Sequence, residues 1–158
     1  MRKAFTMIEV TFVILIIGIL SSVAAPKLAA SRDDGVSTVC VQEVAAFITT
    51  THTTYSRLGY QDFKDLTASQ LTNGQVSLTP PSSSENVFIN TKVDIVGVDY
   101  YCDGSKIIEF VGNVNGGDYV LTVSVEDIDT VEAPIGKAAI AKIKENILGS
   151  DDNKTYAL

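Results

Sequence analysis

The chain begins with an apolar run, Phe5 to Ala25, which contains no lysine or arginine and a single carboxylate, Glu9. A helix rises about 1.5 Å per residue, so about 20 residues cross the hydrocarbon core of a bilayer. The run is long enough to do so. Arg2 and Lys3 precede it, which favours a cytoplasmic start and export of the remainder. A carboxylate in such a segment costs roughly 2.5–3.5 kcal/mol on insertion scales, so Glu9 indicates a function.

Two ordinary interpretations of the run compete. One is a cleaved secretory signal peptide, for which Ser22-Val23-Ala24 is an acceptable small-x-small site. The other is an uncleaved signal anchor. Neither accounts for Glu9, unless its side chain merely extends to the lipid headgroups.

Composition limits the remaining classes of protein. The chain has 158 residues, about one modest domain, and 46% of them are hydrophobic, which argues against disorder. The formal net charge of −7 argues against sequence-independent binding of nucleic acid, which needs lysine and arginine to neutralise phosphates.

The stretch Ala4-Phe5-Thr6-Met7-Ile8-Glu9-Val10 resembles the cleavage and methylation motif of type IV pilins and of type II secretion pseudopilins. The resemblance covers about the first thirty residues. It implies that residues 1–4 are a leader, cut between Ala4 and Phe5, and that prepilin peptidase also N-methylates Phe5. Gly18 and Pro26 stand where the family usually has glycine and a helix-kinking proline. Ala4 departs from the pattern, because the family usually has glycine there.

The resemblance also gives Glu9 a role. Cleavage creates a charged amine on Phe5 at the edge of an apolar environment, and a buried charge needs a partner. If subunits stack, Glu9 of one subunit pairs with the Phe5 amine of its neighbour and fixes the stagger between them.

We therefore expect a structural subunit of a type IV pilus-like filament and not an enzyme. The implied partners are identical or related pilin subunits, prepilin peptidase and the inner-membrane assembly platform. The implied location is the inner membrane, single-pass with a periplasmic head, and then a periplasmic or extracellular filament.

Two other functions stay open. A pseudopilin of a type II secretion system shares every one of the N-terminal motif residues. A membrane-anchored enzyme or ligand-binding domain is the second alternative, and a deep pocket with converging polar groups would favour it. The sequence does not separate pilus from secretion apparatus, nor major from minor subunit.

The expected organisation is a leader (1–4), a transmembrane and filament-core helix (5–25) and an exported globular head (26–158). We expect one helix from Phe5 to Leu58, bent at Pro26 and stopped by Gly59. Steps of three and four residues predict its buried face, which comprises Val36, Cys40, Val44, Phe47, Thr51, Tyr55 and Leu58.

The sequence after the long helix predicts a small antiparallel sheet of three or four strands and a C-terminal helix. With the long helix packed on this sheet, the expected fold is α+β and of the pilin type that the resemblance implies. A short helix is expected within Asp62–Leu71 and the C-terminal helix over Glu132–Leu148, before a loose tail from Gly149. The strand-like runs are Val93–Tyr101, Lys106–Val111 and Tyr119–Val125, the last two flanking a hairpin loop at residues 112–118.

We expect Cys40 and Cys102 to form a disulfide. Both follow the membrane segment, on the exported side where oxidation is permitted. Cys40 lies in phase with the buried face of the long helix, and Cys102 ends a strand-like run before the turn-forming Asp103-Gly104. The alternative is two unrelated buried thiols.

Other candidate sites have weaker signals, and we expect no metal, cofactor or catalytic site. Asn115-Gly116-Gly117 lacks the rest of a phosphate-loop motif and predicts a turn. His52 has no second ligand nearby, and solvated acids are the preferred interpretation of the acidic residues Asp127, Asp129, Asp151 and Asp152. Ser82 to Ser84 are either a flexible loop or a glycosylation site.

Overall fold

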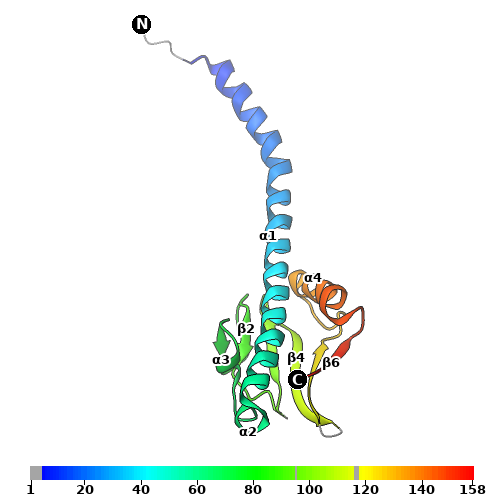
Figure 1. The fold of residues 1–158 in the computed structure, drawn as a ribbon. Helices are drawn as coiled ribbons and strands as arrows, with labels where there is room; N and C mark the ends of the chain where they lie inside the picture. Colours follow the sequence, from blue (N-terminus) through cyan, green and yellow to red (C-terminus); the bar gives the residue numbers. More distant parts are fainter. Residues whose placement is uncertain (1–4, 95, 116–117) are drawn as a thin grey trace. The chain divides into compact units, whose positions relative to one another are not determined.

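The computed structural model describes residues 5–94, 96–115 and 118–158 (Figure 1). Helix α1 runs over Met7–Leu58 and continues through Pro26, so the predicted long helix is confirmed; a bend at Pro26 stays a prediction. It ends where Gly59 takes a φ of 73°, a conformation that suits glycine. Two compact units meet within α1, between Gly35 and Val36.

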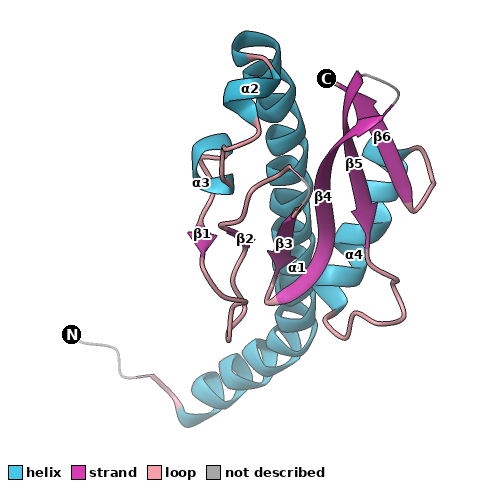
Figure 2. Cartoon of the chain, turned by 90° about the horizontal axis from the view of Figure 1, so that it is seen from below, coloured by secondary structure: helices cyan, strands magenta, loops and turns pink. Residues whose placement is uncertain are grey.

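The second unit is built on a six-stranded sheet with strand order β1-β2-β3-β4-β5-β6 (Figure 2). All neighbouring strands are antiparallel except β1 and β2, which are parallel. The expectation of three or four strands was therefore too low. The strands are β1 Val76–Ser77, β2 Val87–Ile89, β3 Val98–Cys102, β4 Ser105–Asn115, β5 Asp118–Val125 and β6 Asn153–Ala157.

The sheet has one apolar and one polar face, as alternation along its strands requires. In β3, Val98, Tyr100 and Cys102 are buried, whereas Asp99 and Tyr101 are only partly covered. The hairpin between β3 and β4 turns at Asp103-Gly104, where both residues have positive φ, so this predicted turn is confirmed.

Residues 36–58 of α1 cover the apolar face of the sheet. Cys40, Val44, Phe47 and Thr51 are buried on this side, at the predicted spacing of three and four residues, whereas Leu58 is exposed. The Phe47 ring lies with its centroid 5.0 Å from that of Phe88 and 4.5 Å from that of Phe110. This aromatic contact holds the helix on the middle of the sheet. A long apolar N-terminal helix with its second half on a small sheet is a pilin-like, α+β architecture.

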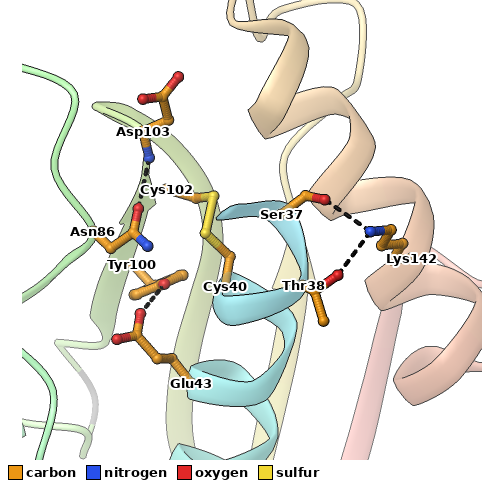
Figure 3. The surroundings of a disulfide bond; sticks show 9 residues. All are labelled: Ser37, Thr38, Cys40, Glu43, Asn86, Tyr100, Cys102, Asp103 and Lys142. Atoms are coloured by element: carbon orange, nitrogen blue, oxygen red, sulfur yellow. Dashed lines mark hydrogen bonds between the residues drawn. A yellow bond between two sulfur atoms is a disulfide. The ribbon is translucent and has the colours of Figure 1, made fainter. Parts of the chain in front are cut away.

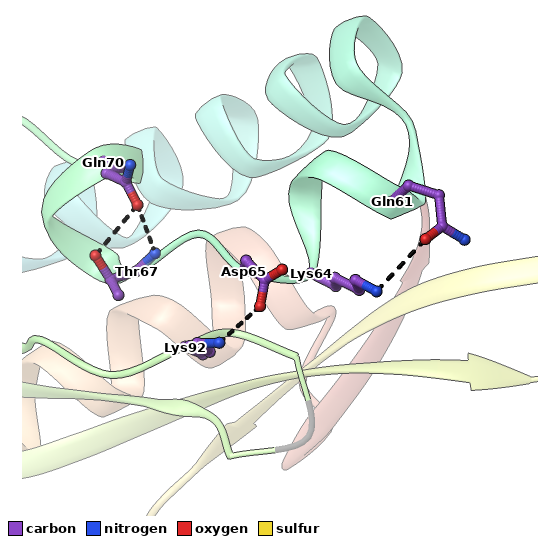
Figure 4. Close-up of polar contacts among 6 residues, drawn as sticks. All are labelled: Gln61, Lys64, Asp65, Thr67, Gln70 and Lys92. Carbon is purple, nitrogen blue, oxygen red and sulfur yellow. Dashed lines mark hydrogen bonds and ion pairs between the residues drawn. The ribbon is translucent and has the colours of Figure 1, made fainter.

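The segment between α1 and the sheet contains two short helices instead of the one expected, α2 (Tyr60–Phe63) and α3 (Ala68–Leu71). A new helix starts because Thr67 and Gln70 form a capping box, in which the Gln70 side chain accepts a bond of 3.0 Å from the Thr67 N–H (Figure 4). Lys92 then pairs with Asp65 at 2.7 Å and ties this segment to the chain after β2 (Figure 4).

The predicted C-terminal helix is confirmed, whereas the tail after it differs from expectation. The helix α4 spans Pro134–Ile143, with Pro134 in its first turn, and continues as a π-helix, η1 (Lys144–Leu148). The tail is not loose, because it forms β6 along β5. Lys154 and Tyr156 of β6 both donate to the carbonyl oxygen of Ile147, at 2.9 and 3.1 Å, which fixes the end of η1 against the strand.

Helix α4 lies on the same face of the sheet as residues 36–58 of α1 (Figure 2). Its buried side chains Ala139, Ile140 and Ile143 join the same hydrophobic core as Cys40 and Val44. The opposite face of the sheet is left without a covering helix among the described residues.

Candidate functional site

The N-terminus of α1 is organised by a contact between Thr6 and Glu9. The Thr6 hydroxyl and the Thr6 N–H both donate to Oε2 of Glu9, at 2.9 and 3.1 Å, and the Glu9 N–H lies 3.4 Å from the Thr6 hydroxyl oxygen. Thr6 immediately precedes the helix and Glu9 is its third residue. This reciprocal pattern is a capping box, which satisfies backbone donors that the first turn of a helix leaves without partners.

The capping box fixes where the Glu9 carboxylate lies. The carboxylate is held at the N-terminal, positive end of the helix dipole, beside Thr6. Phe5 lies one residue before Thr6. Glu9 is exposed, and within the described residues only Thr6 donates to its carboxylate, through Oε2. Its other oxygen, Oε1, accepts no hydrogen bond from a residue in the part of the chain that the structure describes.

The following part of α1 presents apolar side chains to its surroundings. Large hydrophobic residues from Phe5 to Leu28 are 41% to 86% exposed, although such residues are usually buried. The helix is long and apolar enough to cross a membrane. Two of its hydroxyl groups are satisfied internally, because Thr11 donates to the carbonyl of Ile8 at 3.0 Å and Ser22 to that of Ile19 at 2.7 Å. Internal partners of this kind are what hydrocarbon surroundings demand.

A disulfide between Cys40 and Cys102 joins α1 to the end of β3 (Figure 3). The Cα atoms are 6.0 Å apart, within the range that such a bond needs, and both residues are completely buried. This covalent link lies four residues after Val36, where α1 enters the second unit.

Polar bonds flank the disulfide on either side (Figure 3). The buried Tyr100 hydroxyl donates to the Glu43 carboxylate, one turn of α1 beyond Cys40. Burial, and then this bond to a carboxylate, raise the pKa of Tyr100 well above its usual value. On the other side, Lys142 of α4 donates to the hydroxyls of Ser37 and Thr38, at 2.8 and 3.0 Å. The α1–sheet–α4 junction is thus held by one covalent and several polar links.

The weaker candidates lie apart from these features. His52 is exposed on α1, and Ser82 to Ser84 form an exposed loop between β1 and β2. Asp127 accepts a bond of 3.0 Å from the Asp129 N–H, and Asp152 pairs with Lys144. Over residues 5–94, 96–115 and 118–158, no three or more His, Cys, Asp or Glu side chains gather as a metal site would require.

Two predicted features fall outside the described residues. They are Ala4, on the leader side of the expected cleavage, and Gly116-Gly117 of the expected turn.

Surface cavities do exist in the second unit. One of about 390 Å³ is lined by Lys106, Glu126 and their neighbours. Its lysine is already engaged by Asp99 at 2.8 Å and by Glu126 at 3.2 Å.

Sequence reasoning missed the role of Thr6. The signal was present, because Thr6-Met7-Ile8-Glu9 has the Ser/Thr-x-x-Glu spacing of a capping box before an apolar run.

Comparisons with protein-family models, with curated proteins and with solved structures found no match to this chain.

Proposed function

We propose that this chain is the structural subunit of a type IV pilus-like filament, assembled through its hydrophobic N-terminal helix. The observation that carries the proposal is the exposed apolar part of α1 with a carboxylate held at its start by Thr6. An apolar surface of this extent requires a bilayer or other apolar helices around it. In the membrane it spans the lipid, and in a filament the same side chains pack against those of neighbouring subunits.

Glu9 supplies the specificity of this assembly. Cleavage between Ala4 and Phe5 by prepilin peptidase leaves a charged, N-methylated amine on Phe5. Oε2 of Glu9 is used by Thr6, whereas Oε1 accepts the amine of the adjacent subunit. Pairing the two charges removes the cost of leaving either one unpaired in an apolar environment. The inner-membrane platform extracts the subunit, and the head is exported.

Intact mass of the protein from its native membrane tests the processing step. The expected result is loss of Met1 to Ala4 and gain of one methyl group at Phe5. Loss of Arg2 and Lys3 changes the formal side-chain charge from −7 to −9. An N-terminus at Ala25 would instead mean cleavage by ordinary signal peptidase and would overturn the proposal.

Substitution of Glu9 tests the pairing step. Glu9→Ala should leave membrane insertion intact or improve it, because a costly carboxylate is gone. Incorporation into sheared filaments should fall sharply, and Glu9→Asp should be intermediate because its charge remains but its reach is shorter. Glu85→Ala is the matched control, since it removes an exposed carboxylate of the second unit. Wild-type assembly of Glu9→Ala would show that the pairing is wrong.

A further inference from the structure

A short motif at the start of the last strand has no role in the proposed assembly. Asn153-Lys154-Thr155 has the Asn-x-Ser/Thr pattern of acceptors for N-linked glycans, with a residue other than proline in the middle. Of the asparagines in the chain, Asn153 alone is followed two positions later by serine or threonine. The pattern matters only in an exported, accessible segment.

The structure places both key side chains of this motif on the polar face of the sheet. In β6, Asn153 pairs with Ser124 and Thr155 with Thr122 of β5, and the two threonine hydroxyl oxygens are 3.4 Å apart. Lys154 lies between them and pairs with the buried Val123. Because strand residues alternate between faces, Asn153 and Thr155 share the side that lies opposite α1 and α4.

The motif is also accessible. All three of its residues are exposed, and β6 is the last strand of the sheet, paired on one side only with β5 (Figure 2). It follows a turn in which Gly149 and Ser150 both have positive φ. The side chains of Asn153 and Thr155 are therefore open to solvent on the face of β6 that points away from the core, and Tyr156 and Leu158 are the tail residues that pack against the core.

We propose that Asn153 is the acceptor of an N-linked oligosaccharide. Its Nδ2 forms a bond to the anomeric carbon of a glycan carried on a polyprenyl pyrophosphate. The bond from that carbon to the pyrophosphate oxygen breaks, and the pyrophosphate leaves with the electron pair. The amide proton passes to a base of the transferase, and the Thr155 hydroxyl is the recognition group. The inference rests on the proposed function in one respect, namely that this part of the chain is exported.

The site tolerates such an addition. On this face the side chains next to Asn153 and Thr155 are the partly exposed Thr122 and Ser124, so a hydrated glycan at Asn153 lies beside polar groups. The helices α1 and α4 lie on the opposite face, so a glycan at Asn153 does not disturb the hydrophobic core.

Intact mass and peptide mapping of the protein from its native host test this site. The wild-type chain should carry an added mass that corresponds to whole sugar residues, located on the peptide with Asn153. Asn153→Gln and Thr155→Ala should lose it, and Thr155→Ser should keep it, because serine retains the hydroxyl. Asn73→Gln, at an exposed asparagine outside any such motif, is the control and should keep it.

An unmodified wild-type mass would overturn the inference, and so would a sugar mass that persists in Asn153→Gln. The same spectra report the N-terminus, so the two proposals fail separately. A cleaved and methylated chain without sugar would overturn only the glycosylation of Asn153. A glycosylated chain that begins at Ala25 would overturn only the proposed filament function.

Discussion

At the N-terminus of α1, one hydroxyl group connects helix formation to the proposed assembly. Thr6 caps the helix and in doing so holds the Glu9 carboxylate by two bonds to Oε2. An unheld glutamate has three rotatable bonds to fix before it can meet a partner, which costs entropy. Thr6 thus positions the Glu9 carboxylate, and in the proposed assembly its effect is separable from that of the charge itself.

We predict that Thr6→Ala reduces incorporation into filaments while membrane insertion stays normal. Loss of a threonine cap costs about 1 kcal/mol, which corresponds to a roughly fivefold effect on the equilibrium. Thr6→Ser should retain most incorporation. Thr11→Ala is the control, because Thr11 donates to Ile8 and does not contact Glu9. The measurement is the ratio of subunit in the sheared filament fraction to subunit in the membrane, and equal ratios for Thr6→Ala and wild type would contradict the positioning role.

Among the elements, the junction of α1, β3 and α4 determines how the second unit holds its long helix. The Cys40–Cys102 disulfide, the Tyr100–Glu43 bond and the bonds of Lys142 all lie within about two turns after residue 36. Beyond them the helix is held mainly by apolar contacts such as that of Phe47. The links at the junction keep the helix on the sheet at the point where it enters the second unit.

We predict that the double variant Cys40→Ser/Cys102→Ser folds but is markedly less stable. The disulfide closes a loop with a sequence separation of 62 residues, for which chain-entropy estimates give about 4 kcal/mol. Denaturant unfolding of the full chain in detergent, followed by circular dichroism, measures the difference. Thiol counting on the unfolded, unreduced wild-type protein gives the independent check, and two reactive thiols per chain would rule the disulfide out.

At the scale of the whole molecule, two buried tyrosines and one lysine make the free energy of unfolding depend on pH in the alkaline range. Burial, and then the charge of Asp94, raise the pKa of Tyr119, as burial and Glu43 do for Tyr100. Partial burial alone would lower the pKa of Lys106, but its bonds to Asp99 and Glu126 outweigh this and raise it. All three groups therefore hold their protons more tightly in the folded state than in the unfolded state.

We predict that the free energy of unfolding changes little between about pH 7 and pH 9 and falls above about pH 10. The unfolded tyrosines lose protons near pH 10 while the folded ones keep them, so each such group contributes a loss of about 1.4 kcal/mol per pH unit above that value. Tyr100→Phe should be less stable at pH 8, because Glu43 loses a donor, but its stability should fall less steeply above pH 10. Denaturant titrations of the full chain in detergent at about pH 8, 10 and 11 measure both effects, and parallel curves for the two proteins would refute the assignment to Tyr100.

Local sequence patterns were sufficient where a feature depends on neighbouring residues. The long helix, its stop at Gly59, the buried spacing of Cys40, Val44 and Phe47, and the Asp103-Gly104 turn were all predictable. Helical periodicity, glycine conformation and turn chemistry act within a few residues and are therefore readable directly. The capping box of Thr6 and Glu9 belongs to the same class, because its two side chains are three residues apart.

The tertiary structure decided what depends on distant partners. Strand β1 has only two residues, and β6 lies in a polar tail, so neither has an internal pattern that marks it as a strand. Each forms because a neighbouring strand offers unpaired backbone groups. Strand β6 is stabilised further by the hydrogen bond that the Tyr156 hydroxyl donates to the Ile147 carbonyl. The bond from Tyr100 to Glu43 likewise joins residues 57 positions apart. A buried polar group needs a hydrogen-bond partner, and that partner can come from any part of the chain. Which residue it is depends on the packed fold.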